Sequence, residues 1–272
     1  MLREAWAWLS TPCNGEARRL GYLKEAIAFE SRRWRCGEAW RDHLAHCHAA
    51  VRKSLARCAR HGTALVLGSG LALEYPLAEL AARFERVVLA DMVHLRSVRR
   101  LAARHANVVL AETDLTGMAQ RLLAHGGAAT RAELAAWGAT PPAPLADLGR
   151  VDWVLSANVL SQLPLLPVAW LTRRRPDIGD AALDHFGRSL MLRHLDLLAN
   201  FDAERLLLAD AEHTVRDAAG TIVEHTDFAG ALGLDGHAFA SWQWPLAPAG
   251  ELAGGWSREH RVVACRWPGA VR

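Results

Sequence analysis

Apolar residues follow two different spacings along this chain, and the change falls near residue 60. Within residues 1–60 they recur every three or four residues, which is typical of helices that bury one face. The clearest apolar stripe consists of Trp40, Leu44, Cys47, Val51, Leu55 and Cys58. Arg41, Arg52 and Lys53 fall outside it. We therefore predict an N-terminal helical segment over residues 1–60, with a lid over the acceptor pocket as its predicted role.

From Thr63 onward, short apolar runs alternate with helical patterns. The predicted strands are Ala64–Leu67, Val87–Ala90, Asn107–Ala111, Asp152–Ser156 and Arg205–Ala209. Helices are predicted over Pro76–Phe84 and Arg96–Arg104. Apolar strands of this length, separated by helices, favour a parallel sheet that is covered on both faces.

The alternation ends after Asp210. The segment His213–His225 is typical of a hairpin around Asp217–Gly220, and FASWQWPL and REHRVVACRW predict two final strands. The predicted fold is therefore α/β, with a doubly wound, mostly parallel seven-stranded sheet over residues 61–272. Its last strands form an antiparallel hairpin, and the helical segment precedes it.

Candidate chemistry starts at Thr63–Glu74, TALVLGSGLALE, where a strand runs into Gly68 and Gly70. A second strand, RVVLAD, ends in Asp91, 23 residues after the first glycine. Glycines allow backbone and ligand to approach closely, and an acid at the end of the next strand can accept both hydrogen bonds of a ribose diol. This arrangement indicates a ribose-bearing cofactor.

Two other nucleotide sites fit less well. A dinucleotide fingerprint needs a third glycine or alanine where Leu73 stands, so an NAD-dependent oxidoreductase is the least favoured function. No GxxxxGK[ST] sequence is present, which argues against a phosphate-binding P-loop.

Together these pieces resemble the class I S-adenosylmethionine-dependent methyltransferases, whose sheet has a reversed last strand after five parallel ones. The resemblance covers about residues 60–270 and rests on VLGSG, VVLAD, VVLAETDL and VDWVLSANVLSQLP in that order. It implies S-adenosylmethionine as cofactor and methyl transfer to an acceptor that the sequence does not identify. The alternative is a non-catalytic binding or structural protein that retains this fold.

The resemblance places several residues on the cofactor. Gly68, Ser69 and Gly70 would lie against its methionine part, and Asp91 would hold the ribose hydroxyls. Met92 would pack against the adenine. A strand-ending acid that only caps a turn is the alternative for Asp91.

The third strand would complete the adenine site. Asp114 would accept a hydrogen bond from the adenine amino group, with Leu115 beside it, although Thr113 and Glu112 compete for this role. One departure from the family is Val66, which stands where an acid is common.

Two residues are candidates for catalysis. Asn158 follows the fourth strand and would face the transferring methyl group, or else it caps the next helical segment. His213 is the best proton acceptor among the polar residues after strand five, which include Asp210 and Glu212, because an imidazole titrates near neutral pH. A surface histidine at the start of a hairpin is the alternative.

Cysteine usage and apolar run lengths limit the remaining functions. Five cysteines without a CxxC pair indicate reduced thiols, and no run has the length of a membrane span or a signal-peptide core. We therefore expect a cytoplasmic protein without a membrane contact. His43 and Cys47 have the spacing of two metal ligands on a helix, but Cys47 belongs to the apolar stripe, so no metal site is predicted.

Charge and aromatic content bear on the partner. Residues 1–60 hold 12 Lys and Arg against 6 Asp and Glu, which would suit an anionic acceptor or, less well, nucleic acid; a solvated helical face is the simpler interpretation. Trp242 and Trp244 share one side of their strand and would form core packing or a wall around an aromatic acceptor. An insertion, GATPPAPLADLGR, is predicted to form part of a lid or surface before strand four.

Overall fold

The computed structural model describes residues 2–137 and 148–270. The N-terminal segment is helical, as predicted. It contains α1 (Leu2–Ser10), α2 (Gly15–Leu20), α3 (Tyr22–Cys36) and α4 (Arg41–Leu55). Most of the predicted insertion before strand four, 138–147, lies outside the described residues.

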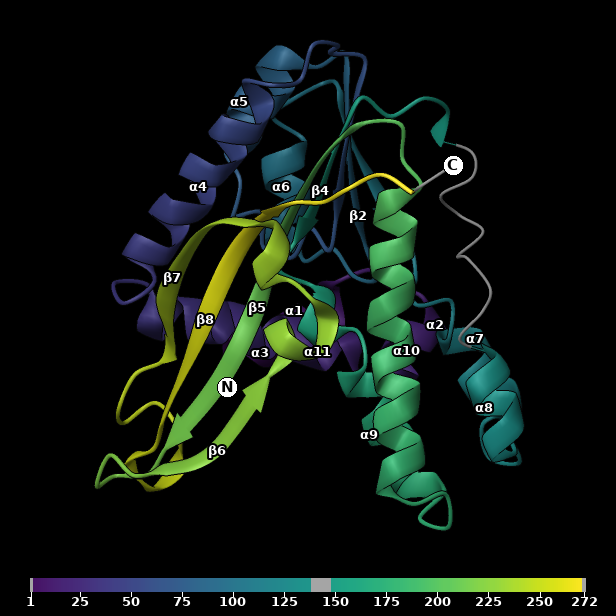
Figure 1. Ribbon diagram of the computed structural model, residues 1–272. Helices are drawn as coiled ribbons and strands as arrows, with labels where there is room; N and C mark the ends of the chain where they lie inside the picture. The colour runs from purple at the N-terminus through teal and green to yellow at the C-terminus, as the bar shows by residue number, and fades with distance from the viewer. Residues whose placement is uncertain (1, 138–147, 271–272) are drawn as a thin grey trace.

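A single mixed sheet organises the rest of the chain (Figure 1). Its strands are β1 (Thr63–Leu67), β2 (Arg86–Asp91), β3 (Val108–Glu112), β4 (Trp153–Ala157), β5 (Glu204–Arg216), β6 (Ile222–Asp227), β7 (Ala238–Ala247) and β8 (Ser257–Arg266). The order is β3-β2-β1-β4-β5-β8-β7. The first five of these are parallel, and β8 and β7 are antiparallel, which confirms the predicted architecture.

One strand comes in addition to the predicted seven. The predicted hairpin at His213–His225 is formed by β6 and the second half of β5. β5 is 13 residues long, so it pairs with β4 at its start and continues beyond the end of β4. A register shift between Asp210 and Glu212 marks the point where β5 leaves the parallel part of the sheet. Side chains there lie at the edge where parallel strands end.

Helices cover both faces of the sheet. They are α5 (Leu77–Arg83), α6 (Arg96–Ala102), α7 (Ala119–His125), α8 (Arg131–Trp137), α9 (Leu165–Arg174), α10 (Asp180–Ala199) and α11 (Phe228–Leu232), with short 3-10 turns at Leu160–Gln162, Asp235–His237 and Ala253–Gly255. Buried residues of α4 and α5 pack on one face, and those of α10 pack on the other. The core is therefore two apolar layers with the sheet between them.

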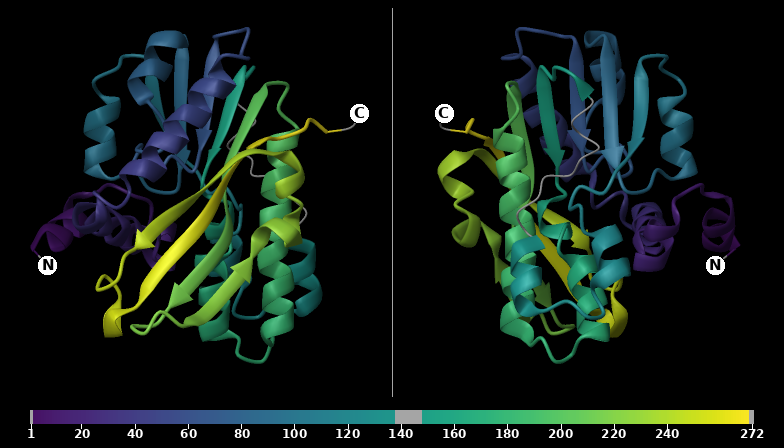
Figure 2. Two further views of the ribbon diagram at one scale, coloured as in Figure 1. Left: turned by 60° about the vertical axis from the view of Figure 1, so that its left-hand side comes forward. Right: turned by 90° about the vertical axis from the view of Figure 1, so that its right-hand side faces the viewer.

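A third apolar cluster lies beyond the carboxyl ends of the parallel strands. It joins Leu20 of α2 and Leu23 of α3 to Met92, just after β2, and to Met118 and Trp170. Figure 2 shows these helices below the short parallel strands in both views. Residues 1–60 thus pack in two places, because α4 lies on the sheet whereas α2 and α3 lie at its carboxyl edge. The division of the chain at residue 60 stays a prediction.

No helix in the described part of the chain is both long and apolar enough to cross a membrane.

Candidate functional site at the carboxyl edge of the sheet

The loop after β1 contains both predicted glycines, and the two are needed for different reasons. Gly68 has a φ of +71°, and a Cβ placed on it would lie 2.4 Å from the Cβ of Val159. Gly70 has a φ of +50°, and the nearest atom to its Cβ position would be the Gly68 carbonyl oxygen at 3.9 Å. Gly68 therefore permits close packing of two loops, whereas the exposed Gly70 leaves room for a ligand.

Asp91 ends β2 directly below this loop. Its Oδ2 accepts a hydrogen bond from the Gly70 N–H at 2.8 Å. Burial raises the pKa of Asp91, and the N–H groups of Gly70, Met92 and Val93 act in the opposite direction. The structure thus brings the glycine loop and this acid together; the binding of a ribose by Asp91 stays a prediction.

Ser69 lies between the glycines with its side chain turned into the protein. It is buried, and its Oγ lies 3.3 Å from His94 Nε2. The Tyr75 hydroxyl donates to the Ser69 carbonyl at 3.2 Å. Burial lowers the pKa of His94 to about 4, so this imidazole is neutral at pH 7. These contacts hold the glycine loop in place from its buried side.

The loop after β3 uses its acid to start a helix. Asp114 Oδ1 accepts from the N–H and the hydroxyl of Thr116, and Asp114 Oδ2 accepts from the Ala119 N–H at 2.6 Å. Glu112 pairs with Arg99. Asp114 thus has a structural task, because it holds the turn before α7 and accepts from the first N–H of that helix; its predicted contact with adenine stays untested.

Thr113, Met92 and Leu115 complete this side of the edge. The hydroxyl of Thr113 is buried without a hydrogen-bond partner in the described chain. Met92 packs in the cluster with α2 and α3. Leu115 packs with the residues of the sheet face that α10 covers.

Tyr22 was missed by sequence reasoning. Burial raises the pKa of its hydroxyl, and the charges of Asp114 and Asp91 add to the shift, while a hydrogen bond with Thr116 opposes it. The charges of both acids of the predicted adenosine site thus act on the first residue of α3. No pattern in residues 1–60 signals this, because the contact is made only by the packing of α3.

Asn158 follows β4 with a fully buried side chain and a left-handed backbone, φ +51°. Its backbone is held, since its N–H donates to the Leu208 carbonyl at 2.9 Å and its carbonyl accepts from Gln162. Neither its Oδ1 nor its Nδ2 has a hydrogen-bond partner in the described chain. The following 3-10 turn has no side-chain cap. The described bonds therefore give no support to the capping alternative.

His213 belongs to a cluster with Asp210 and His260. Its Nε2 lies 3.1 Å from Asp210 Oδ2, and Nδ1 of His260 lies 3.1 Å from Asp210 Oδ1. The imidazoles are stacked at 3.7 Å between ring centroids. Ser161 donates to Asp210 Oδ2 at 2.7 Å. We call Asp210, His213 and His260 the two-histidine cluster.

The charges in this cluster are strongly coupled. Burial acts to raise the pKa of Asp210, but the imidazoles of His260 and His213 outweigh it and hold that pKa well below its ordinary value. Burial lowers the pKa of His260, against the pull of the carboxylate. The sequence pointed to Asp210 and His213 but missed His260, because only the register of β5 with β8 brings His213 opposite His260.

The tryptophans predicted to share a strand side are both buried. Trp242 Nε1 donates to His43 Nδ1 at 3.0 Å, and Trp244 stacks on the same imidazole with 4.0 Å between centroids. His43 Nε2 lies 3.3 Å from Glu74 Oε1, and Cys47 Sγ lies 3.6 Å from the ring. Both nitrogens of His43 have partners, which is typical of a core histidine, so Trp242 and Trp244 serve as packing rather than as an open wall.

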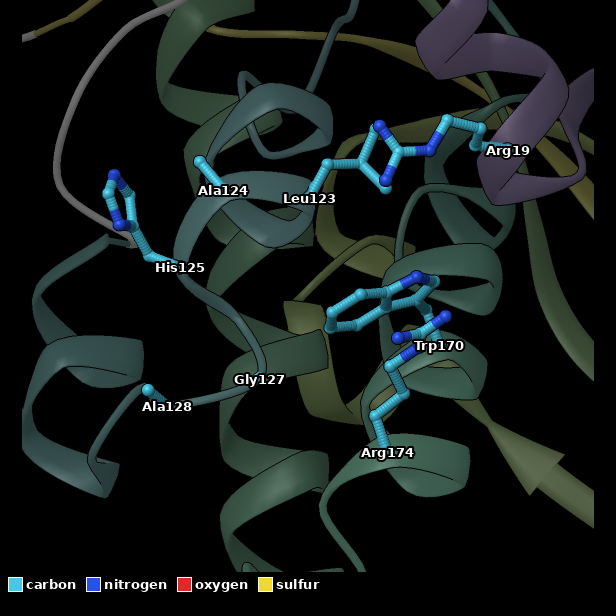
Figure 3. A pocket seen from close by; sticks show the side chains of 8 residues that line it. All are labelled: Arg19, Leu123, Ala124, His125, Gly127, Ala128, Trp170 and Arg174. Atoms are coloured by element: carbon cyan, nitrogen blue, oxygen red, sulfur yellow. The ribbon is translucent and has the colours of Figure 1, made fainter.

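A hollow of about 420 Å³ lies away from these residues, between α2, α7 and α9. Figure 3 shows the Trp170 indole between Arg19 and Arg174, with His125 on the far side. None of the predicted site residues lines it.

Known proteins give limited guidance. No family model matches the chain, and no curated protein matches it. Among solved structures, the N-methyltransferase NodS from Bradyrhizobium japonicum WM9, in complex with S-adenosylhomocysteine, is 14% identical with a TM-score of 0.37, over 85% of this chain and 90% of that one. The Burkholderia thailandensis 1,6-didemethyltoxoflavin-N1-methyltransferase is 13% identical with a TM-score of 0.40, over 94% and 92%. With identities and scores this low, the residues of this chain must carry any functional conclusion.

Proposed function

We propose that this protein transfers a methyl group from S-adenosylmethionine to a small-molecule acceptor at the carboxyl edge of its sheet. The observation that carries the proposal is a buried asparagine, Asn158, whose side-chain amide has no partner, at an edge that also gathers Asp91 and His213. A buried amide without partners is costly unless a ligand supplies them.

The residues at the ends of β1, β2 and β3 suit the cofactor. Asp91 ends its strand with a carboxylate for the ribose diol, and Gly70 has space on the side where a Cβ would stand. Leu20 of α2 and Leu23 of α3 pack in one cluster with Met92, directly after Asp91, so these helices would cover the adenosine. S-adenosylmethionine, when bound, supplies an electrophilic methyl group on a sulfonium.

The residues at the end of β4 and on β5 suit the acceptor. Methyl transfer is an in-line displacement, so the chain must mainly align the acceptor and exclude water. Asn158 would lie beside the methyl group and orient the acceptor through its free amide. A hydroxyl acceptor must also lose its proton as the new bond forms, and we assign this step to His213 together with Asp210.

The test is a calorimetric titration of the folded protein with S-adenosylhomocysteine, S-adenosylmethionine and NAD. We expect both sulfur compounds to bind and NAD not to bind. Absence of binding by S-adenosylhomocysteine at millimolar concentration would reject the proposal. Binding without turnover of any acceptor would instead favour a non-catalytic protein that retains the site.

A further inference from the structure

The two-histidine cluster has the composition of a metal site. One ligand atom from each of Asp210, His213 and His260 can be chosen so that all three lie within 4.8 Å of one another. Two imidazoles and one carboxylate are a donor set that suits Zn²⁺, Fe²⁺ and Co²⁺. Ligands that share an ion at bonds of about 2.1 Å are roughly 3 to 3.5 Å apart. Both nitrogen-to-oxygen distances to Asp210, 3.1 Å, already fall in this range.

Unmet bonding capacity in the cluster is a second, independent observation. The His260 side chain is buried, with 5% of the residue exposed; its Nδ1 meets only Asp210 Oδ1, at 3.1 Å, and its Nε2 has no hydrogen-bond partner within the described chain. Oδ1 of Asp210 is also buried without a hydrogen bond. Buried polar atoms in folded proteins almost always have partners, and an ion would provide one for Asp210 Oδ1 and for one ring nitrogen of His260.

The surroundings supply support and access. Ser161 donates to Asp210 Oδ2 at 2.7 Å, which is the kind of outer contact that orients a ligand carboxylate. His213 keeps 17% of its side chain exposed, so the cluster opens to solvent on one side. The two rings now lie nearly parallel, at 19°, and they must tilt for both nitrogens to face a single ion.

We propose that Asp210, His213 and His260 bind one divalent transition-metal ion, with coordination positions left open on the side of His213. The site stands on the geometry of the cluster alone; only its use rests on the proposed function. A cation at this place would lower the pKa of an acceptor hydroxyl that reaches it, so that its proton could pass to bulk water before the methyl group arrives. In the metal-bound protein, His213 and Asp210 would act in the proton step as ligands of the ion instead of taking the proton themselves, and acceptors that carry a hydroxyl group would be favoured.

The experiment titrates the metal-free, full-length protein with Co²⁺ and Zn²⁺, followed by calorimetry and by the visible absorption of Co²⁺. We expect one ion per chain. His260→Gln and Asp210→Asn should weaken binding at least a hundredfold. The matched control is His225→Gln, an exposed histidine on β6 that lies outside the cluster, and it should leave the affinity unchanged. No binding at millimolar metal, or wild-type affinity in both cluster variants, would overturn the proposal.

Because Asp210 and His260 are buried, a wild-type measurement is needed beside the variants. X-ray absorption of the Zn²⁺ form should show imidazole nitrogen and oxygen ligands without sulfur. A sulfur ligand would place the ion at Cys47, near His43 and Glu74, and would overturn the assignment. Titration with S-adenosylhomocysteine separates the two proposals. If this compound binds but neither metal ion binds, only the metal site is rejected. If a metal ion binds but this compound does not, only the proposed function is rejected.

Discussion

The two halves of the sheet's carboxyl edge are assembled in different ways. The half at β1, β2 and β3 takes Gly70, Asp91 and Asp114 from one continuous stretch, and the bond between Gly70 and Asp91 spans 21 residues. The half at β4, β5 and β8 takes Asn158, Asp210 and His260 from distant segments. The first half is a local motif, whereas the second exists only once the antiparallel strands are in register.

This difference teaches where function can vary. A local motif fixes its ligand through backbone and turn geometry, so few side chains can change without loss of the loop. A site assembled by strand register can exchange its side chains while the sheet stays intact. If the proposed function holds, the half at β1, β2 and β3 would hold the cofactor, and the half at β4, β5 and β8 would hold the acceptor.

The largest expected loss of stability comes from a substitution at the contact between the two halves, where Gly68 lies against Val159. Gly68→Ala places a Cβ 2.4 Å from that of Val159 at a φ of +71°, so overpacking and backbone strain should cost roughly 3–5 kcal/mol of unfolding free energy. Gly70→Ala is the matched control, because it carries similar strain without the clash, and it should cost roughly 1–2 kcal/mol. Urea unfolding measures both, and equal losses would contradict the argument.

A pH experiment compares a buried histidine from each half. His94, bonded to Ser69, and His194, bonded to Ser156, both have a pKa lowered to about 4 by burial, from an unfolded value of 6.5. The unfolded chain binds these protons more readily, so stability should fall as pH drops from about 6.5 to 4. The full loss is about 3 kcal/mol for each histidine.

His194→Gln should therefore flatten the dependence of unfolding free energy on pH within that window. The exposed His225→Gln should leave the slope as in the wild type. An unchanged slope in His194→Gln would show that His194 is not the neutral buried group inferred from its environment.

On the cofactor half, Asp91→Ala should weaken the binding of S-adenosylhomocysteine by roughly 1.5–3 kcal/mol, the range for the loss of hydrogen bonds to a charged group. Glu79→Ala, a change of an exposed acid on α5, serves as the control and should leave affinity unchanged. Calorimetry measures both. If the wild-type protein binds this compound but Asp91→Ala has normal affinity, the assignment of Asp91 fails while the proposed function stands.

The smallest effect on stability is expected at Asn158, although its effect on turnover should be large. Asn158→Ala removes a side chain without described partners but places alanine at a φ of +51°, so the loss should stay within about 1 kcal/mol. Asn158→Gly removes the same side chain and relieves the backbone. Both variants should bind S-adenosylhomocysteine and lose methyl transfer; normal turnover in either one rejects the role of the amide.

How far the sequence predicts this molecule follows the same division. The parallel strands, the terminal antiparallel pair and the meeting of the glycine loop with Asp91 could all be predicted, because they depend on local periodicity and fixed spacing. His260 and Tyr22 could not, since one joins the site by strand register and the other by the packing of α3. The packing of α4 on the sheet face was likewise hidden, because an apolar stripe shows that a helix is buried but not against what.

The missing side chain at Gly68 also has a consequence for the order of events at the edge. Val159 lies directly against that glycine, so a displacement of the loop after β1 is passed to the segment that begins at Asn158. A first ligand that settles one loop would thereby change the affinity for a second ligand at the other, and by thermodynamic reciprocity the factor would be the same in both directions. The edge would then behave as one cooperative unit, in which occupancy by the cofactor prepares the place of the acceptor.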